Sequence, residues 1–244
     1  MERVLIAGAA GRLGREIARV LEDDYQVRLF DAVGDGEGEW VLGEPVDPEA
    51  AGRALEGVDA LILTGEPPLQ VPADEVARDE MILDWATRGT HVLCTAAVEE
   101  GVKRIVYGGT LEVFAGYPDT VYISEMHKPL PGPEIYSMAR YLGELTCREF
   151  ARDHRLTATG LRLGKLVCAE EVDRREADYL WLDRRDAAQA FQRALPLDRS
   201  EALEWNGRWA LYHIAAEWAK PKFLIDRARS MGYEPEYHFE GGRA

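Results

Sequence analysis

The chain has 244 residues, 46% of them hydrophobic and 30% charged, and no stretch approaches the ~20 consecutive apolar residues that a membrane-spanning helix needs. Its formal net charge of -15 argues against nucleic acids and anionic membranes as partners, because nothing offsets their repulsion. The three cysteines lie far apart in apolar segments and the five histidines lack ligand spacing, so we expect neither a disulfide framework nor a metal site. The first residues lack the features of a signal peptide, which makes the cytoplasm the expected location.

Short apolar runs alternate with segments of helical periodicity over the first two thirds of the chain. Strands are predicted at residues 4–7, 26–30, 59–63, 104–107 and 158–163, and helices at 13–21, 73–100, broken or bent near Gly89, and 135–152. Strands that alternate with helices form a parallel sheet covered on both faces. The sequence therefore predicts an α/β protein with a Rossmann-type doubly wound sheet.

The pattern changes after about residue 165. Charged and aromatic residues become frequent, and two shorter helical patterns, 185–195 and 221–231, flank a predicted strand at 209–214. We expect residues 1–165 to form the sheet domain and 166–239 a small C-terminal lobe packed on it, with the helix at 183–195 returning to the sheet. Residues 240–244 are expected to be a flexible tail.

Three glycines, Gly8, Gly11 and Gly14, separate the first strand from the first helix. Such a turn is either a tight connection alone or a cradle whose backbone N–H groups and helix terminus bind a diphosphate. Asp31 ends the next strand at about the spacing where a carboxylate accepts hydrogen bonds from an adenosine ribose, which favours the cradle. An acid there also repels a 2′-phosphate, so NAD is favoured over NADP, although Arg12 within the turn could tolerate that phosphate.

An ordered series of further motifs resembles the extended branch of the short-chain dehydrogenase/reductase superfamily, the NAD-dependent epimerases, dehydratases and dehydrogenases of sugars. Its members here are GAAGRLG, Asp31, Val46-Asp47, RIVYGGTLEVF, IYSMARYLGE, GLRLGK and LWLDRRDAAQAF, and they look most similar to uronate dehydrogenases. The resemblance implies a C-terminal substrate lobe and an NAD site formed by Gly8, Gly11, Arg12, Leu13, Gly14, Asp31, Asp47, Thr64, Tyr136 and Arg140. It also implies catalytic roles for Thr110, Tyr136 and Arg140.

The pair Tyr136 and Arg140 has a chemical rationale of its own. Residues four apart on a helix share one face, so their side chains can converge on one site. A phenol has a reference pKa of about 10, and a neighbouring cation favours the phenolate, which turns the tyrosine into a usable acid and base. Thr110 follows a strand at the edge of the sheet where ligands gather, and its hydroxyl could hold the substrate oxygen.

The chain departs from the family pattern at several positions. Arg140 replaces the usual lysine and Ala86 a frequent asparagine, and the turn Thr64-Gly65-Glu66-Pro67-Pro68 replaces a small, alanine-rich one. Leu111-Glu112 stands where uronate dehydrogenases have Asn-His, which argues against uronate itself. Glu112 and Arg174 are the candidate substrate contacts.

Two functions remain open at this point. The first is an NAD-dependent oxidoreductase or epimerase that acts on a small sugar, polyol or sugar derivative by tyrosine-assisted hydride transfer. The second is a catalytically weak NAD(P)-binding sensor or partner-binding protein of the same fold, which the changes at Ala86 and Arg140 motivate. By the resemblance, a homodimer is expected through the helices at 73–100 and 135–152.

Overall fold

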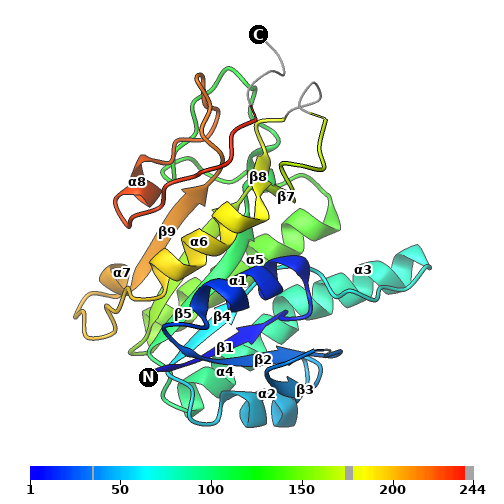
Figure 1. The fold of residues 1–244 in the computed structure, drawn as a ribbon, viewed down its shortest axis with the longest axis vertical. Coiled ribbons are helices and arrows are strands. Elements are labelled where there is room, and N and C mark those ends of the chain that lie inside the picture. The colour runs from blue at the N-terminus through cyan, green and yellow to red at the C-terminus, as the bar shows by residue number, and fades with distance from the viewer. Residues whose placement is uncertain (35, 174–177, 240–244) are drawn as a thin grey trace.

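Strands and helices alternate through most of the computed structural model, which describes residues 1–34, 36–173 and 178–239 (Figure 1). The strands are β1 (Arg3–Ala7), β2 (Gln26–Asp31), β3 (Glu39–Leu42), β4 (Ala60–Leu63), β5 (Arg104–Thr110), β6 (Thr157–Leu163), β7 (Lys165–Val167), β8 (Trp181–Asp183) and β9 (Trp209–Ile214). The helices are α1 (Arg12–Leu21), α2 (Pro48–Leu55), α3 (Glu75–Leu83), α4 (Thr90–Glu99), α5 (Ile135–Asp153), α6 (Arg184–Ala194), α7 (Trp205–Arg208) and α8 (Asp226–Arg229).

Seven strands form one parallel sheet in the order β3-β2-β1-β4-β5-β6-β9. The predicted doubly wound fold is confirmed. The strand order reverses at β1, which has β2 on one side and β4 on the other. In such sheets ligands bind beyond the carboxyl ends of the strands at this switch point. The segments that follow β1, β2 and β4 therefore define where a cofactor site belongs.

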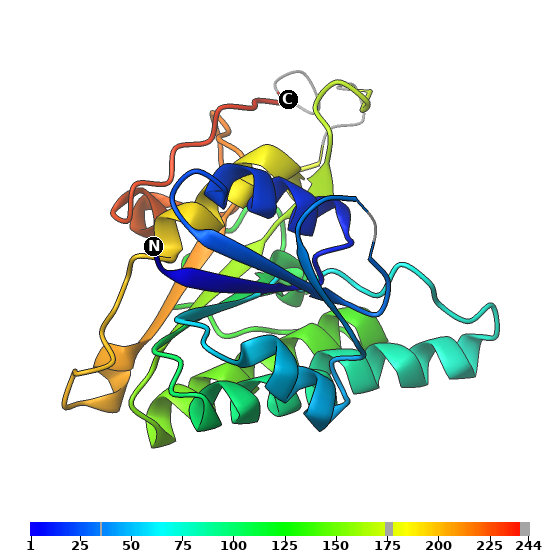
Figure 2. The same ribbon diagram turned by 60° about the horizontal axis from the view of Figure 1, so that its bottom comes forward.

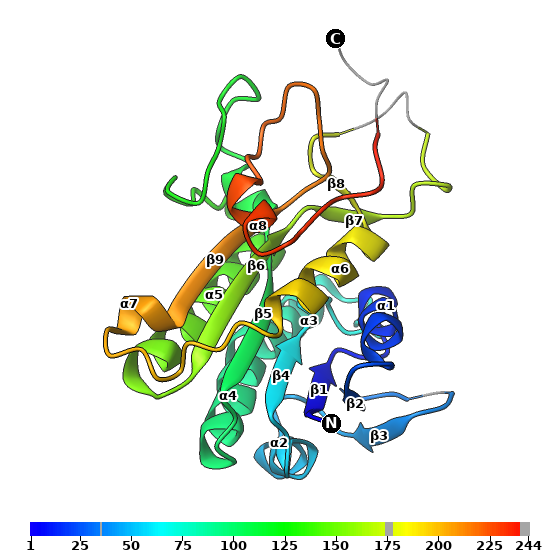
Figure 3. The same ribbon diagram turned by 60° about the vertical axis from the view of Figure 1, so that its left-hand side comes forward.

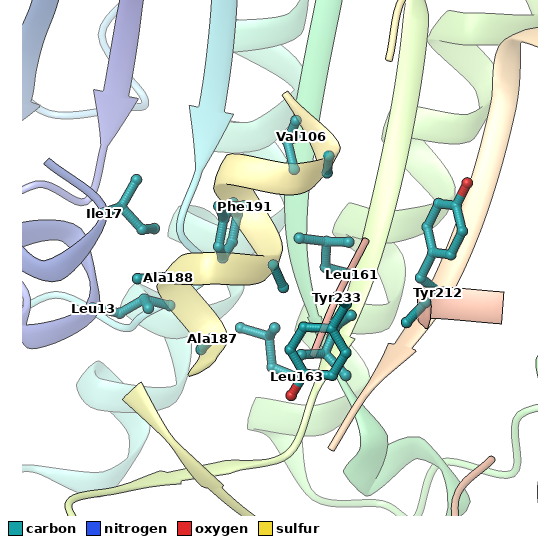
Figure 4. Close-up of a cluster of buried hydrophobic side chains, with 14 of the residues drawn as sticks. Leu13, Ile17, Val106, Leu161, Leu163, Ala187, Ala188, Phe191, Tyr212 and Tyr233 are labelled. Atoms are coloured by element: carbon teal, nitrogen blue, oxygen red, sulfur yellow. The ribbon is translucent and has the colours of Figure 1, made fainter. Parts of the chain in front are cut away.

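Helices cover both faces of the sheet. In Figure 2, α1 and α6 lie on one face, and α2, α4 and α5 lie on the other; Figure 3 shows the same two layers from the side. Side chains of β1 alternate between the layers: Val4 and Ile6 join one buried apolar cluster, and Leu5 joins the other. Figure 4 shows the first cluster, where Phe191 of α6 packs among side chains of α1 and the sheet. Burial of apolar side chains on both faces holds the carboxyl edge of the sheet in place.

Several elements differ from the sequence prediction, and α2, α7, β7 and β8 are among those that it did not include. The strand at 209–214 forms as expected, but β9 pairs with β6 as the seventh strand of the main sheet, so the C-terminal part shares that sheet. This pairing covers the edge of β6, all of whose residues are buried. The predicted helix at 221–231 shortens to α8, because Lys222 and Leu224 exchange backbone hydrogen bonds with Ile123 and Phe223 forms an isolated β-bridge with it. The short, largely exposed strand β3 was not predicted.

The predicted helix at 73–100 is helical without interruption from Glu75 to Glu99, and a change of helix type stands where a break or bend was expected. A π-helical segment, Asp84–Gly89, joins α3 to α4. Wider helical turns of this kind frequently occur at functional positions. Here the segment brings Ala86 to the wall of the cavity described below. Within the described residues, no helix is both long enough and apolar enough to cross a membrane. The predicted tail at 240–244 lies outside the described residues.

His213 of β9 is fully buried between the rings of Phe114 and Phe223. Neither ring nitrogen of His213 has a hydrogen-bond partner among the described residues. Burial, assisted by the positive charge of Arg162, lowers the pKa of His213 from 6.5 to about 3. The imidazole is therefore neutral in the folded protein at any pH above this value.

This burial predicts a pH dependence of stability. The unfolded chain takes up a proton at His213 below pH ~6.5 while the folded protein does not, so the contribution of His213 is fully present above pH 6.5 and declines as the pH falls towards 3. Between pH 7 and pH 5 the free energy of unfolding should fall by about 2 kcal/mol from this group. Urea denaturation of the wild type and of His213→Leu at both pH values measures this fall. The free energy of unfolding of the variant should fall by about 2 kcal/mol less than that of the wild type. Equal losses would contradict a neutral buried imidazole.

Candidate functional site

The glycine turn has the geometry of an anion cradle. Gly8 adopts φ +86°, and its N–H donates to the carbonyl of Phe30 at 3.0 Å. A methyl group at Gly14 would overlap the Gly8 carbonyl, so this glycine lets α1 pack against the loop. Gly11 is the N-cap of α1 and offers no side chain to the N–H groups of the first turn, which lack a partner within the helix. Such groups, together with the positive end of the helix, attract an anion.

Two carboxylates already meet backbone N–H groups of this loop. Asp31 ends β2, and its Oδ2 accepts a hydrogen bond from the N–H of Ala10 at 3.1 Å. The Oε2 of Glu66 accepts from Leu13 N–H at 2.8 Å and, more weakly, from Gly14 N–H at 3.3 Å. The sequence singled out the turn that contains Glu66 as unusual but did not predict its contact with α1. Only the pairing of β1 with β4, which brings the two loops together, could have indicated it.

Burial raises the pKa of Glu66 above its ordinary value. The hydrogen bonds from Gly14 and Leu13 and the positive charge of Arg140 oppose this rise, while the negative charge of Asp31 adds to it. Glu66 is therefore a partly desolvated carboxylate, and hydrogen bonds from the backbone of α1 offset most directly the cost of that desolvation.

A cavity opens beside the cradle at the switch point of the sheet. Its wall contains the predicted cofactor residues Gly8, Gly11, Asp31 and Thr64, and much of the rest is apolar. The other lining residues include Phe30, Ala32, Glu44, Pro45, Leu63, Glu66, Pro67, Pro68, Trp85, Ala86, Leu93 and Tyr107. A largely apolar slot with a few polar groups suits a flat heteroaromatic ring such as adenine.

Asp47, one of the predicted cofactor residues, lies at the start of α2. Asp47 is the N-cap of α2, where its carboxylate accepts a hydrogen bond from Glu49 N–H at 3.0 Å, and it does not line the cavity. Asp47 caps a helix because it directly precedes Pro48, a residue well suited to the first helical position. Glu44 and Pro45 line the cavity in its place.

Arg140 connects Tyr136 to the end of β5. Its Nη1 donates to Tyr136 Oη at 3.0 Å, and its Nη2 donates to the carbonyls of Gly108 at 2.9 Å and Gly109 at 2.6 Å. The guanidinium is buried, and its Nε has no partner among the described residues. The two side chains converge as their spacing on α5 predicted. One planar cation therefore links the phenol of Tyr136 to the carboxyl end of β5.

Thr110 is the last residue of β5, next to the carbonyls that Arg140 binds. Its Oγ1 accepts a hydrogen bond from Glu112 N–H at 3.2 Å and donates to Glu112 Oε2 at 3.3 Å. Both distances are long, and the hydroxyl is engaged within its own turn. The predicted substrate contact Glu112 thus lies directly beside Thr110.

A buried ion pair between β6 and α5 stabilises this arrangement. Arg162 of β6 donates to both carboxylate oxygens of Glu144 on α5, at 2.8 and 2.7 Å, and both side chains are at most 5% exposed. Tyr107 of β5 donates its hydroxyl proton to the carbonyl of Arg140 at 2.9 Å. These contacts fix α5 against the sheet, so Tyr136 and Arg140 are carried on a rigid element.

Two further predicted cofactor residues line a second hollow. Arg12 and Leu13 line it together with Glu66 and Arg184, between α1 and the short strand β7. Arg174, the other predicted substrate contact, lies outside the described residues. Cys168, Glu170 and Asp183 come close enough to hold a metal ion, but the guanidinium of Arg185 already pairs with both carboxylates.

Comparison with known proteins places these features in a family. Residues 4–182 match the family model described as the NAD dependent epimerase/dehydratase family. An NAD-dependent glucose-6-phosphate dehydrogenase of Haloferax volcanii is 28% identical, over 98% of this chain and 96% of its own. A uronate dehydrogenase of Pseudomonas syringae pv. tomato is also 28% identical, over 79% of this chain and 69% of its own.

Solved structures show the same fold. A short-chain dehydrogenase/reductase superfamily protein from Agrobacterium tumefaciens with bound NAD superposes with a TM-score of 0.80 at 20% identity. The match covers 98% of this chain and 94% of that one.

Gly65 is predicted to be essential for the close approach of the turn after β4 to β5. It adopts φ +73°, and a methyl group there would overlap the carbonyl oxygen of Gly108. Gly101 is a matched control, since it adopts φ +76° in open space. Gly101→Ala should destabilise the protein by about 1–2 kcal/mol, the penalty of a left-handed backbone, and Gly65→Ala by at least about 3 kcal/mol. Urea denaturation measures both, and equal losses would contradict the predicted overlap.

Proposed function

Because the chain belongs to the NAD-dependent epimerase/dehydratase family, we propose that it is an NAD-dependent oxidoreductase acting on a small sugar, polyol or sugar derivative. The observation that carries the proposal is the Arg140 guanidinium, hydrogen-bonded at once to the phenol of Tyr136 and to the carbonyls that precede Thr110. This arrangement stands at the carboxyl edge of the sheet, where ligands of such folds bind.

The residues present suit NAD. Gly8, Gly11 and Gly14 carry no side chains of their own that would block a diphosphate, and the first turn of α1 presents the N–H groups of Leu13 and Gly14, which the Glu66 carboxylate now binds. The Asp31 carboxylate accepts one hydrogen bond at each oxygen and keeps lone pairs for ribose hydroxyls. The buried Nε of Arg140, unpartnered among the described residues, is a further donor for a hydroxyl. When bound, NAD supplies the hydride acceptor or donor.

The roles of the chain's own residues follow from their contacts. Tyr136 moves the proton at its Oη, and Arg140 stabilises the negative charge that develops on this oxygen. Thr110 orients the substrate oxygen through Oγ1, in exchange for its long hydrogen bond to Glu112. The Glu112 carboxylate repels an anionic group, so a neutral reacting end of the substrate is favoured.

The proposal includes a homodimer and a cytoplasmic location; the latter rests on the sequence alone. A groove runs between the α3–α4 segment and α5, with Leu142 40% exposed and Leu145 and Phe150 beside it. These apolar side chains suit a second copy of the chain.

The dimer is tested by sedimentation velocity. The wild type should sediment with twice the mass of one chain, and Leu142→Glu should shift the equilibrium to the monomer because it brings like charges together in the groove. A monomeric wild type at micromolar concentration would reject the dimer and leave the proposed chemistry untouched.

Turnover with NAD is the central prediction. Neutral sugars, polyols, uronates and sugar phosphates are offered with NAD, and absorbance of the reduced nicotinamide is followed. At least one of these substrates should be oxidised, and Tyr136→Phe should lower kcat by about 10²–10⁴-fold, because the proton loses its carrier. Binding of NAD without turnover on any of them would favour the sensor function.

Arg140→Lys tests whether the site is built around arginine. An ammonium group cannot reproduce three hydrogen bonds in a planar fork, so kcat should fall by at least about tenfold in the same assay. Activity above that of the wild type would instead identify the arginine as a handicap.

A further inference from the structure

The anion site at the start of α1 is filled by the protein itself. Glu66 Oε2 accepts hydrogen bonds from Leu13 and Gly14 N–H, and a methyl group at Gly11 would overlap this same oxygen. These are the N–H groups that a diphosphate would use, because the first residues of a helix have no partners within it. A carboxylate and a diphosphate cannot occupy this position together.

The turn after β4 delivers the carboxylate to this position. Leu63, the last residue of β4, pairs with Ala7 of β1, so the chains leaving the two strands run side by side. Gly65 then takes its left-handed conformation, and the N–H of Glu66 donates to Thr64 Oγ1 at 3.3 Å. Two prolines follow directly and restrict the backbone further. The backbone on both sides of Glu66 is thus restricted, while its side chain keeps three rotatable bonds.

The contact is weak enough to be exchanged. Burial raises the pKa of Glu66 against the two N–H donors, so desolvation offsets part of what the hydrogen bonds contribute. A diphosphate brings more oxygens and more negative charge to the same donors. Repulsion between the two anions would then drive the side chain of Glu66 away from α1.

We propose that Glu66 is an intramolecular competitor of the cofactor diphosphate, which holds the anion site in the empty cleft and leaves it when a dinucleotide binds. The inference rests on the proposed function and refines it. Competition weakens the binding of oxidised and reduced dinucleotide alike and so favours their exchange. A dehydrogenase needs fresh oxidised cofactor in every turnover, whereas an epimerase can retain one. Glu66 therefore favours the dehydrogenase over the epimerase.

Removal of the carboxylate tests the competition. Tryptophan fluorescence, with Trp85 in the cavity wall, or calorimetry gives the Kd for NAD of the wild type, Glu66→Ala and the isosteric Glu66→Gln. Glu66→Ala should bind NAD at least about tenfold more tightly, and Glu66→Gln should show a smaller gain in the same direction, because it keeps an acceptor but loses the charge. If Glu66→Ala does not fold, Glu66→Gln decides alone.

Two controls separate local competition from general charge. Glu201→Gln removes the same charge from the exposed loop between α6 and α7, at a residue that does not line the cavity, and should leave the Kd unchanged. For the Glu66 variants, ADP should share the gain in affinity and adenosine should not, because only a diphosphate reaches the start of α1. An equal gain with adenosine would overturn the proposed competition.

The remaining outcomes are distinct. NAD affinity of the Glu66 variants equal to or weaker than that of the wild type would overturn the inference, because Glu66 would then be a structural cap or a cofactor ligand. NAD binding by the wild type would still support the proposed function in that case. If neither the wild type nor any variant binds NAD, the proposed function falls, and the inference falls with it.

Discussion

The hydrogen bonds of one buried guanidinium hold the candidate site together. Arg140 reaches from α5 to the carbonyls of Gly108 and Gly109 and to the hydroxyl of Tyr136. The helix and the strand are tied again by Tyr107, which donates to the carbonyl of Arg140. Because β5 is buried along its whole length, it provides a rigid reference for the helix. The position of the Tyr136 phenol and the positive charge beside it therefore both depend on Arg140.

Arginine at this position changes what the site can do. A guanidinium is planar and presents five donors, so it can bind strand carbonyls and a phenol in one fixed geometry. An ammonium group is a compact charge that would reach fewer of these acceptors at once. The chain has thus gained a structural tie where the family resemblance leads one to expect lysine. In exchange, the arginine does not release a proton, and any proton relay from Tyr136 must run through another group.

The candidate cofactor site combines an anion cradle with nearby carboxylates. Asp31 and Glu66 both accept hydrogen bonds from the loop and first turn around α1, and Glu44 lines the same cavity. In a chain with a net charge of -15, a dinucleotide diphosphate enters an acidic neighbourhood. Because the net charge of the chain repels an anion at long range, directed N–H groups and apolar contact with the rings would supply much of the binding. Such a site favours moderate affinity and exchange.

The sequence by itself determined the local parts of this protein. Strand and helix periodicity predicted the parallel sheet, the glycine spacing predicted the cradle, and the four-residue spacing of Tyr136 and Arg140 predicted their contact. Each of these depends on neighbouring residues and on regular geometry, which a sequence displays directly. Asp47 shows that one local pattern can serve two roles, because an aspartate that precedes a proline also caps a helix.

Only the tertiary structure decided which distant segments meet. It placed β9 in the main sheet beside β6 and shortened the last helix to suit the contact with Ile123. It also brought Glu66 to α1, across 53 residues of sequence. Contacts of this kind depend on strand order and on the path of a turn at the end of a strand. The periodicity of a single segment carries no information on strand order or on the path of such a turn. The sequence therefore predicted the glycine cradle, and only the tertiary structure showed that Glu66 occupies it.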